Sequence, residues 1–173
     1  NLPGHQDFGG TWSNKKFNDL DQDPRTILSQ ILLPNRGIPL QTFKDSWCFF
    51  YNMDHYLYVK EGTKDQGIGV FARYGVSDGK ANPIKYFASF GISGKGIIPG
   101  RCQDTFGLGY YHLWFTDNLP SIVFKNFLHG NEQGGELYYN IYLTPWVQLT
   151  PDLQIIESGN KQVDNTVIVG GLR

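Results

Sequence analysis

"EQGGELYYNIYLTPWVQLTPDLQII", residues 132–156, is the stretch that decides the fold. Apolar and polar residues alternate on both sides of Pro145, so the stretch predicts two β-strands joined by a very short turn. One face of such a strand pair is apolar and the other suits water. The polar members of the alternation are Glu136, Asn140, Gln148, Asp152 and Gln154. The pattern leaves open whether the apolar face covers a protein core or meets something else.

The whole chain has the composition of a β-protein with many turns. Of its 173 residues, 15% are aromatic and 21 are glycine, which is high for a helical protein. The formal net charge is −1 and the pI about 6.5. The chain therefore lacks the basic surface of a nucleic-acid-binding protein, and we expect no nucleic-acid partner.

Cysteine content and hydropathy also limit the possible classes. Cys48 and Cys102 allow at most one disulfide, and we expect both thiols to be free. No signal peptide is visible at Asn1, and no apolar run reaches the ~18 residues of a membrane helix. A membrane β-barrel would show no such run, because its strands carry only an alternating pattern.

Strand-like segments recur along the chain, each followed by a cluster of Gly, Pro, Asn or Asp. No sustained helical period of about 3.6 residues and no domain boundary is visible. We therefore expect a single all-β, antiparallel piece of about eight strands. The predicted strands are 4–13, 46–59, 67–76, 85–93, 104–115, 134–144, 146–156 and 163–172.

The connections between these segments differ in length in an ordered way. The long ones, 14–45 and 116–133, fall at the same end of an up-and-down sheet, and the tight turn at Pro145 falls at the opposite end. Long loops at one end and short turns at the other are typical of outer-membrane β-barrels.

All four tryptophans stand at predicted strand ends beside turn residues. Indole prefers a membrane–water interface, where its body is apolar and its N–H stays hydrated. The pattern favours a membrane-interface girdle over tryptophans that cap a soluble core. The predicted interface residues are Trp12, Trp47, Trp114 and Trp146.

Strand alternation assigns a second set of side chains to the water-facing side. These candidates for lining a pore are Asp54, Arg73, Lys85, Glu136, Tyr138, Asn140, Asp152 and Gln154. They mix both charge signs with amides and phenols, a lining that suits neutral polyhydroxyl solutes. A soluble sandwich would alternate in the same way, so periodicity alone does not choose between the two folds.

The sequence offers little support for an enzyme. Glycines in "FGISGKGIIPGR" lack the spacing and the Ser or Thr of a phosphate-binding loop. The four histidines are far apart, and no Gly-x-Ser-x-Gly elbow is present. Glu136 and Asp152 could form a glycosidase pair, but isolated polar residues on a hydrated strand face are commoner. We expect no catalytic residues, no metal and no cofactor.

Four stretches of the chain are informative together: "NLPGHQDFGGTWSNKKFNDLDQDPR", "DSWCFFYNMDHYLYV", "GVFARYGVSDGKANPIKYFASFGISGKGIIPGRCQDTFGLGYY" and the opening stretch. Within them the strings Gly75-Val76-Ser77-Asp78-Gly79, Ile98-Pro99-Gly100-Arg101 and Thr144-Pro145-Trp146 are specific in combination. In this order, the four stretches resemble the C-terminal half of the carbohydrate-selective porin (OprB-like) family of Gram-negative outer membranes.

The resemblance implies about half of an antiparallel transmembrane β-barrel of about sixteen strands that lets sugars diffuse passively. It implies mono- or oligosaccharide solutes, contact with outer-membrane lipid, and a bacterial outer-membrane location. It also implies that the N-terminal half of the barrel and a signal peptide are absent from residues 1–173. A monomer and a homo-trimer both agree with it.

Two other functions stay open at this point. A soluble β-sandwich that binds glycans would bury its apolar faces and need no detergent. An outer-membrane β-barrel hydrolase would need a nucleophile and a base in contact.

Overall fold

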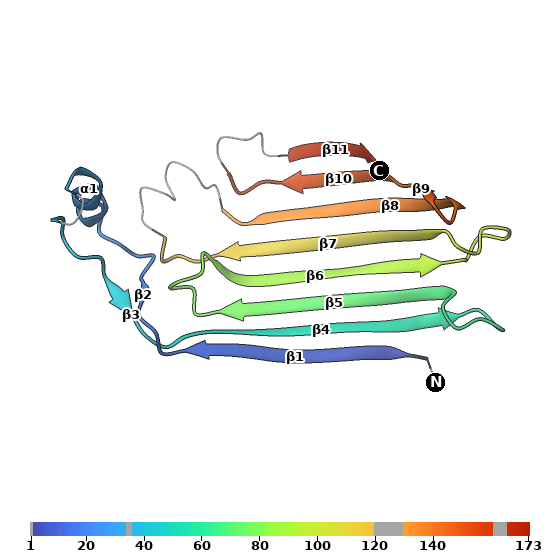
Figure 1. Ribbon diagram of the computed structural model, residues 1–173, viewed down its shortest axis with the longest axis horizontal. Helices are drawn as coiled ribbons and strands as arrows, with labels where there is room; N and C mark the ends of the chain where they lie inside the picture. The colour runs from blue at the N-terminus through green and yellow to red at the C-terminus, as the bar shows by residue number, and fades with distance from the viewer. Residues whose placement is uncertain (1, 34–35, 120–129, 161–165) are drawn as a thin grey trace.

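The computed structural model describes residues 2–33, 36–119, 130–160 and 166–173. Within them one antiparallel sheet of nine strands carries the fold, in the order β1-β4-β5-β6-β7-β8-β10-β11, with β9 paired to β8 (Figure 1). Neighbours in the sheet are also neighbours in the chain, apart from the excursion between β1 and β4. The strands of the sheet are β1 (Gly4–Ser13), β4 (Ser46–Val59), β5 (Gly67–Ser77), β6 (Ile84–Lys95), β7 (Thr105–Phe115), β8 (Glu132–Thr144), β9 (Val147–Leu149), β10 (Pro151–Glu157) and β11 (Thr166–Leu172).

The strands lie close to where the alternation predicted them, and the all-β antiparallel class is confirmed. The predicted strand 146–156 is divided into β9 and β10 at Thr150. Pro151 has no N–H to donate to the ladder at this point, and Thr150 exchanges backbone hydrogen bonds with Arg173 instead, at 2.7 and 3.0 Å. Long and short connections also fall at opposite ends of the sheet, as expected (Figure 1).

The connection 14–45 has regular structure that the strand pattern did not predict. It contains β2 (Phe17–Asn18), α1 (Pro24–Leu32) and β3 (Thr42–Phe43), with β2 and β3 paired. Asp23 begins the helix by accepting a hydrogen bond from the Arg25 N–H at 2.7 Å, and a proline follows it at the first helical position. These elements lie beyond one end of the sheet (Figure 1).

The described part of the chain holds no helix that is long and apolar enough to cross a membrane. More unusually, no hydrophobic side chain among the described residues is buried. The buried side chains are polar and include Gln22, Thr26, Ser77, Asp104 and Thr116. Burial of apolar surface is the main driving force of soluble folds. The described residues form no such buried core beneath either face of the sheet.

Asp78 fastens the β5–β6 turn at the long-loop end. Its carboxylate accepts hydrogen bonds from Ser46 Oγ at 2.5 Å and from the N–H groups of Trp47, Lys80 and Ala81 at 3.0, 2.6 and 3.2 Å. Burial raises the pKa of this carboxyl, but these hydrogen bonds outweigh it, so the pKa lies below its ordinary value.

At the other end of the sheet, Asp104 connects the β6–β7 turn to β8. It accepts hydrogen bonds from Arg101 Nε at 2.7 Å, Tyr139 Oη at 2.8 Å and the Tyr142 N–H at 2.9 Å. Burial raises the pKa of Asp104, but the three donors outweigh it and the pKa is lowered. Both turns therefore hold ionised carboxylates at neutral pH.

Replacing Asp78 with asparagine should destabilise the complete protein by the order of 1 kcal/mol, because part of the donor set loses its acceptor. The lowered folded pKa means that the contribution is present above the unfolded pKa, about 3.9, and is lost as pH falls through the folded value. Thermal unfolding of wild type and variant should therefore differ at pH 7 and converge in acid. Asp117→Asn, an exposed carboxyl in the next loop, is the control; equal midpoints for Asp78→Asn and wild type at pH 7 would contradict the assignment.

Candidate functional site

The sheet has two faces of different chemistry, and the strand register decides which side chains share a face. Residues paired across antiparallel strands point to the same side. One such row crosses six strands and contains Asp54, Phe71, Gly91, Gly109, Glu136 and Gln154. We call the face that carries this row the polar face.

The polar face gathers seven of the eight predicted pore-lining residues. They are Asp54, Arg73, Glu136, Tyr138, Asn140, Asp152 and Gln154. Lys85 stands at the bulge where the β6–β7 register shifts between Ile84 and Tyr86, so the register does not fix its face. It lines a hollow of about 320 Å³ together with Cys48 and Phe87 of the polar face, and its Nζ lies 5.6 Å from the ring centroid of Tyr86. Its place in the pore lining stays a prediction.

Arg173 joins two of the predicted carboxylates. Its Nε donates to Asp152 Oδ2 at 2.8 Å and its Nη2 donates to Glu136 Oε1 at 3.0 Å. Gln154 Nε2 also approaches Glu136 Oε1, at 3.4 Å. A guanidinium held by two carboxylates has a fixed orientation, and its remaining N–H groups are available to a solute.

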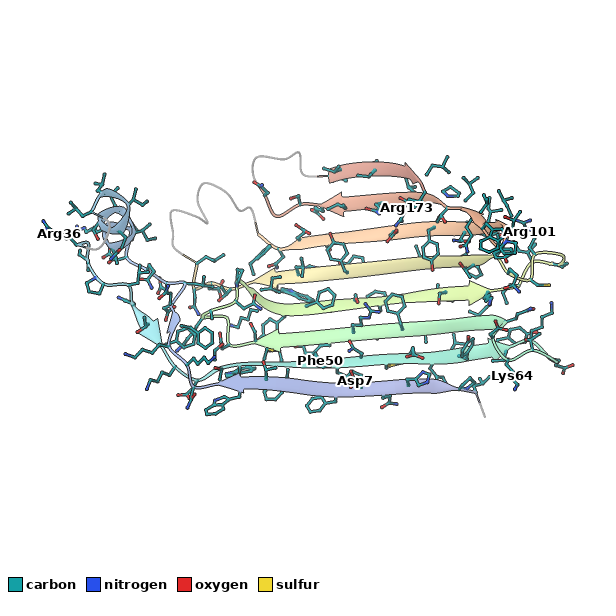
Figure 2. All side chains as sticks on the ribbon, in the orientation of Figure 1. Asp7, Arg36, Phe50, Lys64, Arg101 and Arg173 are labelled. Carbon is teal, nitrogen blue, oxygen red and sulfur yellow. The ribbon has the colours of Figure 1, made fainter. Side chains whose placement is uncertain are left out.

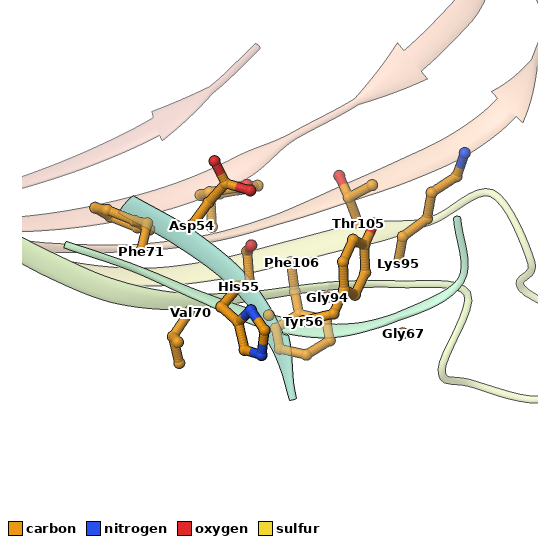
Figure 3. A pocket seen from close by; sticks show the side chains of 13 residues that line it. Asp54, His55, Tyr56, Gly67, Val70, Phe71, Gly94, Lys95, Thr105 and Phe106 are labelled. Carbon is orange, nitrogen blue, oxygen red and sulfur yellow. The ribbon is translucent and has the colours of Figure 1, made fainter. Parts of the chain in front are cut away.

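The polar face carries several hollows, two of which lie side by side. The first, of about 310 Å³, is lined by side chains that include Asp54, Tyr56, Lys95, Thr105 and Tyr138. Figure 3 shows Asp54, Thr105 and Lys95 pointing to one side of the sheet, and His55 and Val70 pointing to the other. In this hollow Asp54 Oδ2 lies 2.9 Å from His5 Nδ1, within hydrogen-bonding distance.

The second hollow, of about 400 Å³, lies beside the first and shares Phe71 with it. Its lining includes Arg73, Tyr111, Glu136 and Gln154. Hydrogen-bond donors and acceptors, among them positively and negatively charged groups, thus line both hollows. Asp7 on β1 and Arg173 after β11 mark the extent of this face from one edge toward the other (Figure 2).

Sequence reasoning missed several residues of this face. Arg173 and Lys95 lay outside the predicted strands, which ended at 172 and 93, although β6 in fact continues to Lys95. Phe71 and Tyr111 are aromatic, so an alternation of apolar and polar residues does not predict them on the polar face. Extending the alternation of Arg73 and Ser89 by two residues would have found Phe71 and Gly91.

The opposite face, here the apolar face, leaves large hydrophobic side chains in the open. Phe90, Leu108, Leu137 and Ile155 are 58, 53, 51 and 48% exposed. Trp12, Trp47 and Trp114 lie on this face at the long-loop end, with Trp12 paired to Trp47. Trp146 lies in the β8–β9 turn at the other end and is 92% exposed.

A cluster of hydrogen-bonded polar side chains interrupts the apolar face close to the long-loop end. Tyr110 Oη donates to Gln133 Oε1, whose own Nε2 donates to Glu157 Oε2. His112 Nδ1 lies 3.2 Å from Tyr110 Oη, and its ring stacks on Trp114 at 4.0 Å between centroids. His112 Nε2 in this cluster is a buried side-chain nitrogen without a hydrogen-bond partner among the described residues.

The geometry provides for contact rather than for catalysis. Among the described residues, no group of three or more His, Cys, Asp or Glu side chains is arranged to hold a metal ion. Glu136 and Asp152, the candidate glycosidase pair, both accept hydrogen bonds from Arg173, at 3.0 and 2.8 Å, so the two carboxylates hold one guanidinium between them. The mixed charges and amides offer many weak hydrogen bonds to an uncharged solute.

Comparison with known proteins gives one family. The family model described as carbohydrate-selective porin, OprB family, matches residues 1–173. Porin B of Pseudomonas aeruginosa is 25% identical over 190 aligned positions, covering 98% of this chain and 40% of that protein. A high-pH structure of Pseudomonas putida OprB matches with a TM-score of 0.79 and 23% identity, covering 99% of this chain and 44% of that one. The chain thus spans less than half the length of either relative.

The tryptophans at the long-loop end should report the polar boundary of a bilayer. In the complete protein reconstituted in lipid, single-tryptophan variants that keep Trp12, Trp47 or Trp114 should be quenched most by bromine placed near the headgroups. Phe90→Trp in a tryptophan-free background, at mid-strand on the same face, should be quenched most by bromine deep in the acyl chains. The same depth profile at all four positions would be evidence against this placement.

Proposed function

The chain belongs to the carbohydrate-selective porin, OprB family, and from that premise we propose that the complete protein is a passive sugar-permeable pore of the bacterial outer membrane. One observation carries the proposal. The sheet has an apolar face without a buried core and a polar face that collects acids, bases and amides. A wall between lipid and a water-filled lumen needs these two faces.

In this proposal the apolar face meets outer-membrane lipid. About 25 cal/mol is gained for each Å² of apolar surface removed from water, so the exposed side chains of this face favour transfer into hydrocarbon. Antiparallel pairing satisfies the backbone groups of the interior strands, as the hydrocarbon requires. Trp12, Trp47 and Trp114 then lie at one membrane–water interface, and Trp146 lies near the other.

The polar face lines the lumen. Asp54, Arg73, Glu136, Asn140 and Gln154 supply donors and acceptors to hydroxyl groups, and Tyr138 adds a ring. Neither sign of charge dominates this face. Its hydrogen-bonding groups therefore replace part of the water that a neutral solute loses when it enters the pore. Mono- and oligosaccharides are the solutes that this chemistry suits. Lys85, at the bulge near the long-loop rim, lines the lumen close to its mouth.

Closing the barrel requires further strands along the outer edges of β1 and β11, since an open edge in hydrocarbon leaves backbone groups unpaired. The two relatives extend well beyond the part that this chain matches. We propose that a further barrel segment, the N-terminal half, pairs with both edges. The homo-trimer compatible with the resemblance stays a prediction.

The two alternatives receive less support. A soluble glycan-binding sandwich needs its apolar faces packed together, whereas large side chains of this sheet stand open to the surroundings. A barrel hydrolase needs an activated nucleophile, and the described residues of the polar face offer hydrogen-bonded carboxylates instead. Family and fold point to a channel rather than an enzyme.

Liposome swelling with the complete protein tests the proposal. Glucose should enter quickly, and a charged solute of similar size should enter more slowly. Equal rates of entry for glucose and the charged solute would indicate a general porin without a preference for sugars. The absence of swelling from correctly inserted protein would remove the channel function altogether.

The lumen assignment has its own test in ion selectivity. Asp54→Asn, Glu136→Gln and Asp152→Asn in one protein remove negative charge from the polar face and leave Arg173 without its two carboxylate partners. The reversal potential in a salt gradient should move toward anion preference. Glu157→Gln, a carboxylate on the apolar face, is the control and should leave the potential unchanged. An unmoved potential in the triple variant, with unaltered glucose entry, would count against the face assignment.

A further inference from the structure

Arg173 is fixed in the ladder toward the end of the sheet that has the short turns. Its backbone N–H and carbonyl exchange hydrogen bonds with Thr150, which extends the register of β10 and β11 by one pair. Strand alternation therefore places its side chain on the polar face, together with Asp152. Figure 2 shows Arg173 in the half of the sheet that ends at the turn of Arg101, here the short-turn half.

Asp152 is a buried acid whose place depends on a glycine. Its side chain is 5% exposed, whereas those of Glu136 and Arg173 are 43 and 65% exposed. A Cβ on Gly171, which is opposite Asp152 in the register, would lie 2.7 Å from both of its carboxylate oxygens. The carboxylate thus lies where a side chain of β11 would stand, and from there Oδ2 accepts the hydrogen bond of Arg173 Nε. Asp152 holds the guanidinium, and the guanidinium itself stays open.

The open side of this cluster borders a further hollow of about 300 Å³. Asn140 Nδ2 donates to Gln148 Oε1 and to Thr150 Oγ1, at 3.0 Å each. The amide oxygen of Asn140 is therefore left as an acceptor, and the Thr150 hydroxyl keeps its own hydrogen to donate. The residues that line the hollow are Glu136, Tyr138, Asn140, Thr150 and Arg173.

A guanidinium held between carboxylates matches two neighbouring hydroxyl groups of a solute. Arg173 donates through Nε and Nη2 to the two acids, and among the described residues its other N–H groups have no acceptor. A hydroxyl that accepts from one of these N–H groups can donate its own hydrogen to Glu136 or Asn140, and the next hydroxyl can meet another N–H of the planar fork. Two carboxylates beside one guanidinium disfavour an anion at the same place.

We propose that Glu136, Asn140 and Arg173 form a hydroxyl-binding position in the short-turn half of the lumen, which takes two neighbouring hydroxyl groups of a neutral sugar, and that Asp152 is its positioning residue. The inference rests on the proposed pore function and adds one binding position to it. Binding is weak, because Glu136 and Arg173 are also open to water, and a weak position lets the sugar leave.

A cysteine beside the hollow measures its occupancy in the complete protein. Gln148→Cys places a thiol next to Asn140, in an otherwise cysteine-free background that includes Cys48→Ser and Cys102→Ser. Glucose should slow the reaction of this thiol with a small neutral methanethiosulfonate, and the dependence on glucose concentration gives an apparent Kd. A polyethylene glycol of similar size, which lacks neighbouring hydroxyl groups, should slow the reaction much less.

Two variants in this background change only how the guanidinium is presented. Arg173→Lys keeps the charge and loses the fork, and Gly171→Ala keeps every charged group but displaces the Asp152 carboxylate. Each should raise the apparent Kd for glucose about two- to tenfold, the range for loss of one net hydrogen bond. The matched controls are Arg36→Lys, beyond the other end of the sheet, and Gly170→Ala, whose methyl would meet nothing within 4 Å. Both controls should leave the apparent Kd unchanged.

Unchanged apparent Kd values in Arg173→Lys and Gly171→Ala, in pores that conduct and pass glucose, would overturn the hydroxyl-binding position and leave the pore function standing. Equal protection by glucose and by polyethylene glycol would also overturn it, since filling of the lumen would then slow the thiol without recognition of hydroxyl groups. Failure of the wild-type pore to pass glucose would overturn the pore function and the hydroxyl-binding position together.

Discussion

A strand in hydrocarbon has no water to hydrogen-bond its backbone, and the rest of this structure depends on that constraint. The long antiparallel ladder from β1 to β11 meets it by pairing each interior strand on both sides. Once the backbone is paired, the side chains are free to differ completely between the two faces. In the pore that we propose, the sheet needs no core of its own, because lipid takes the place of a core on one side and water fills the other.

The turns at the strand ends differ from the strands in which side chains they bury. They bury polar groups, and they satisfy them: Asp78 and Asp104 each collect several donors, and Thr116 Oγ1 donates to the Gly79 carbonyl at 2.7 Å across the long-loop end. In the proposed pore, the stability of this wall therefore comes from the backbone ladder, from charged acceptors at its two ends, and from the bilayer. On the polar face, the Phe71 and Tyr138 rings lie where a Cβ on Gly91 or Gly107 would stand, so a larger residue at either glycine would meet a ring.

Alternation alone located the strands, the two ends of the sheet and most of the polar face, because the period of two is strict wherever the ladder is regular. It failed where the ladder is not regular. At the bulge between Ile84 and Tyr86 the register does not fix the face of Lys85, and Pro151 divides a strand that otherwise keeps its register. It could not find α1, whose nine residues are too short for a clear helical period, although Asp23-Pro24 is a helix-start signal. Arg173 escaped because its role depends on a pairing between β10 and β8 that no local pattern reveals.

The central claim is that successive residues of one strand face water and lipid in turn. Spin labels placed one at a time along residues 134–141 of β8, in the complete protein in bilayers, test it most directly. Collision with oxygen, which concentrates in lipid, and with a water-soluble nickel complex should both vary with a period of two and in opposite phase. Glu136, Tyr138 and Asn140 should be the positions open to nickel. Accessibilities that rise and fall together, or that show no alternation, would contradict the account.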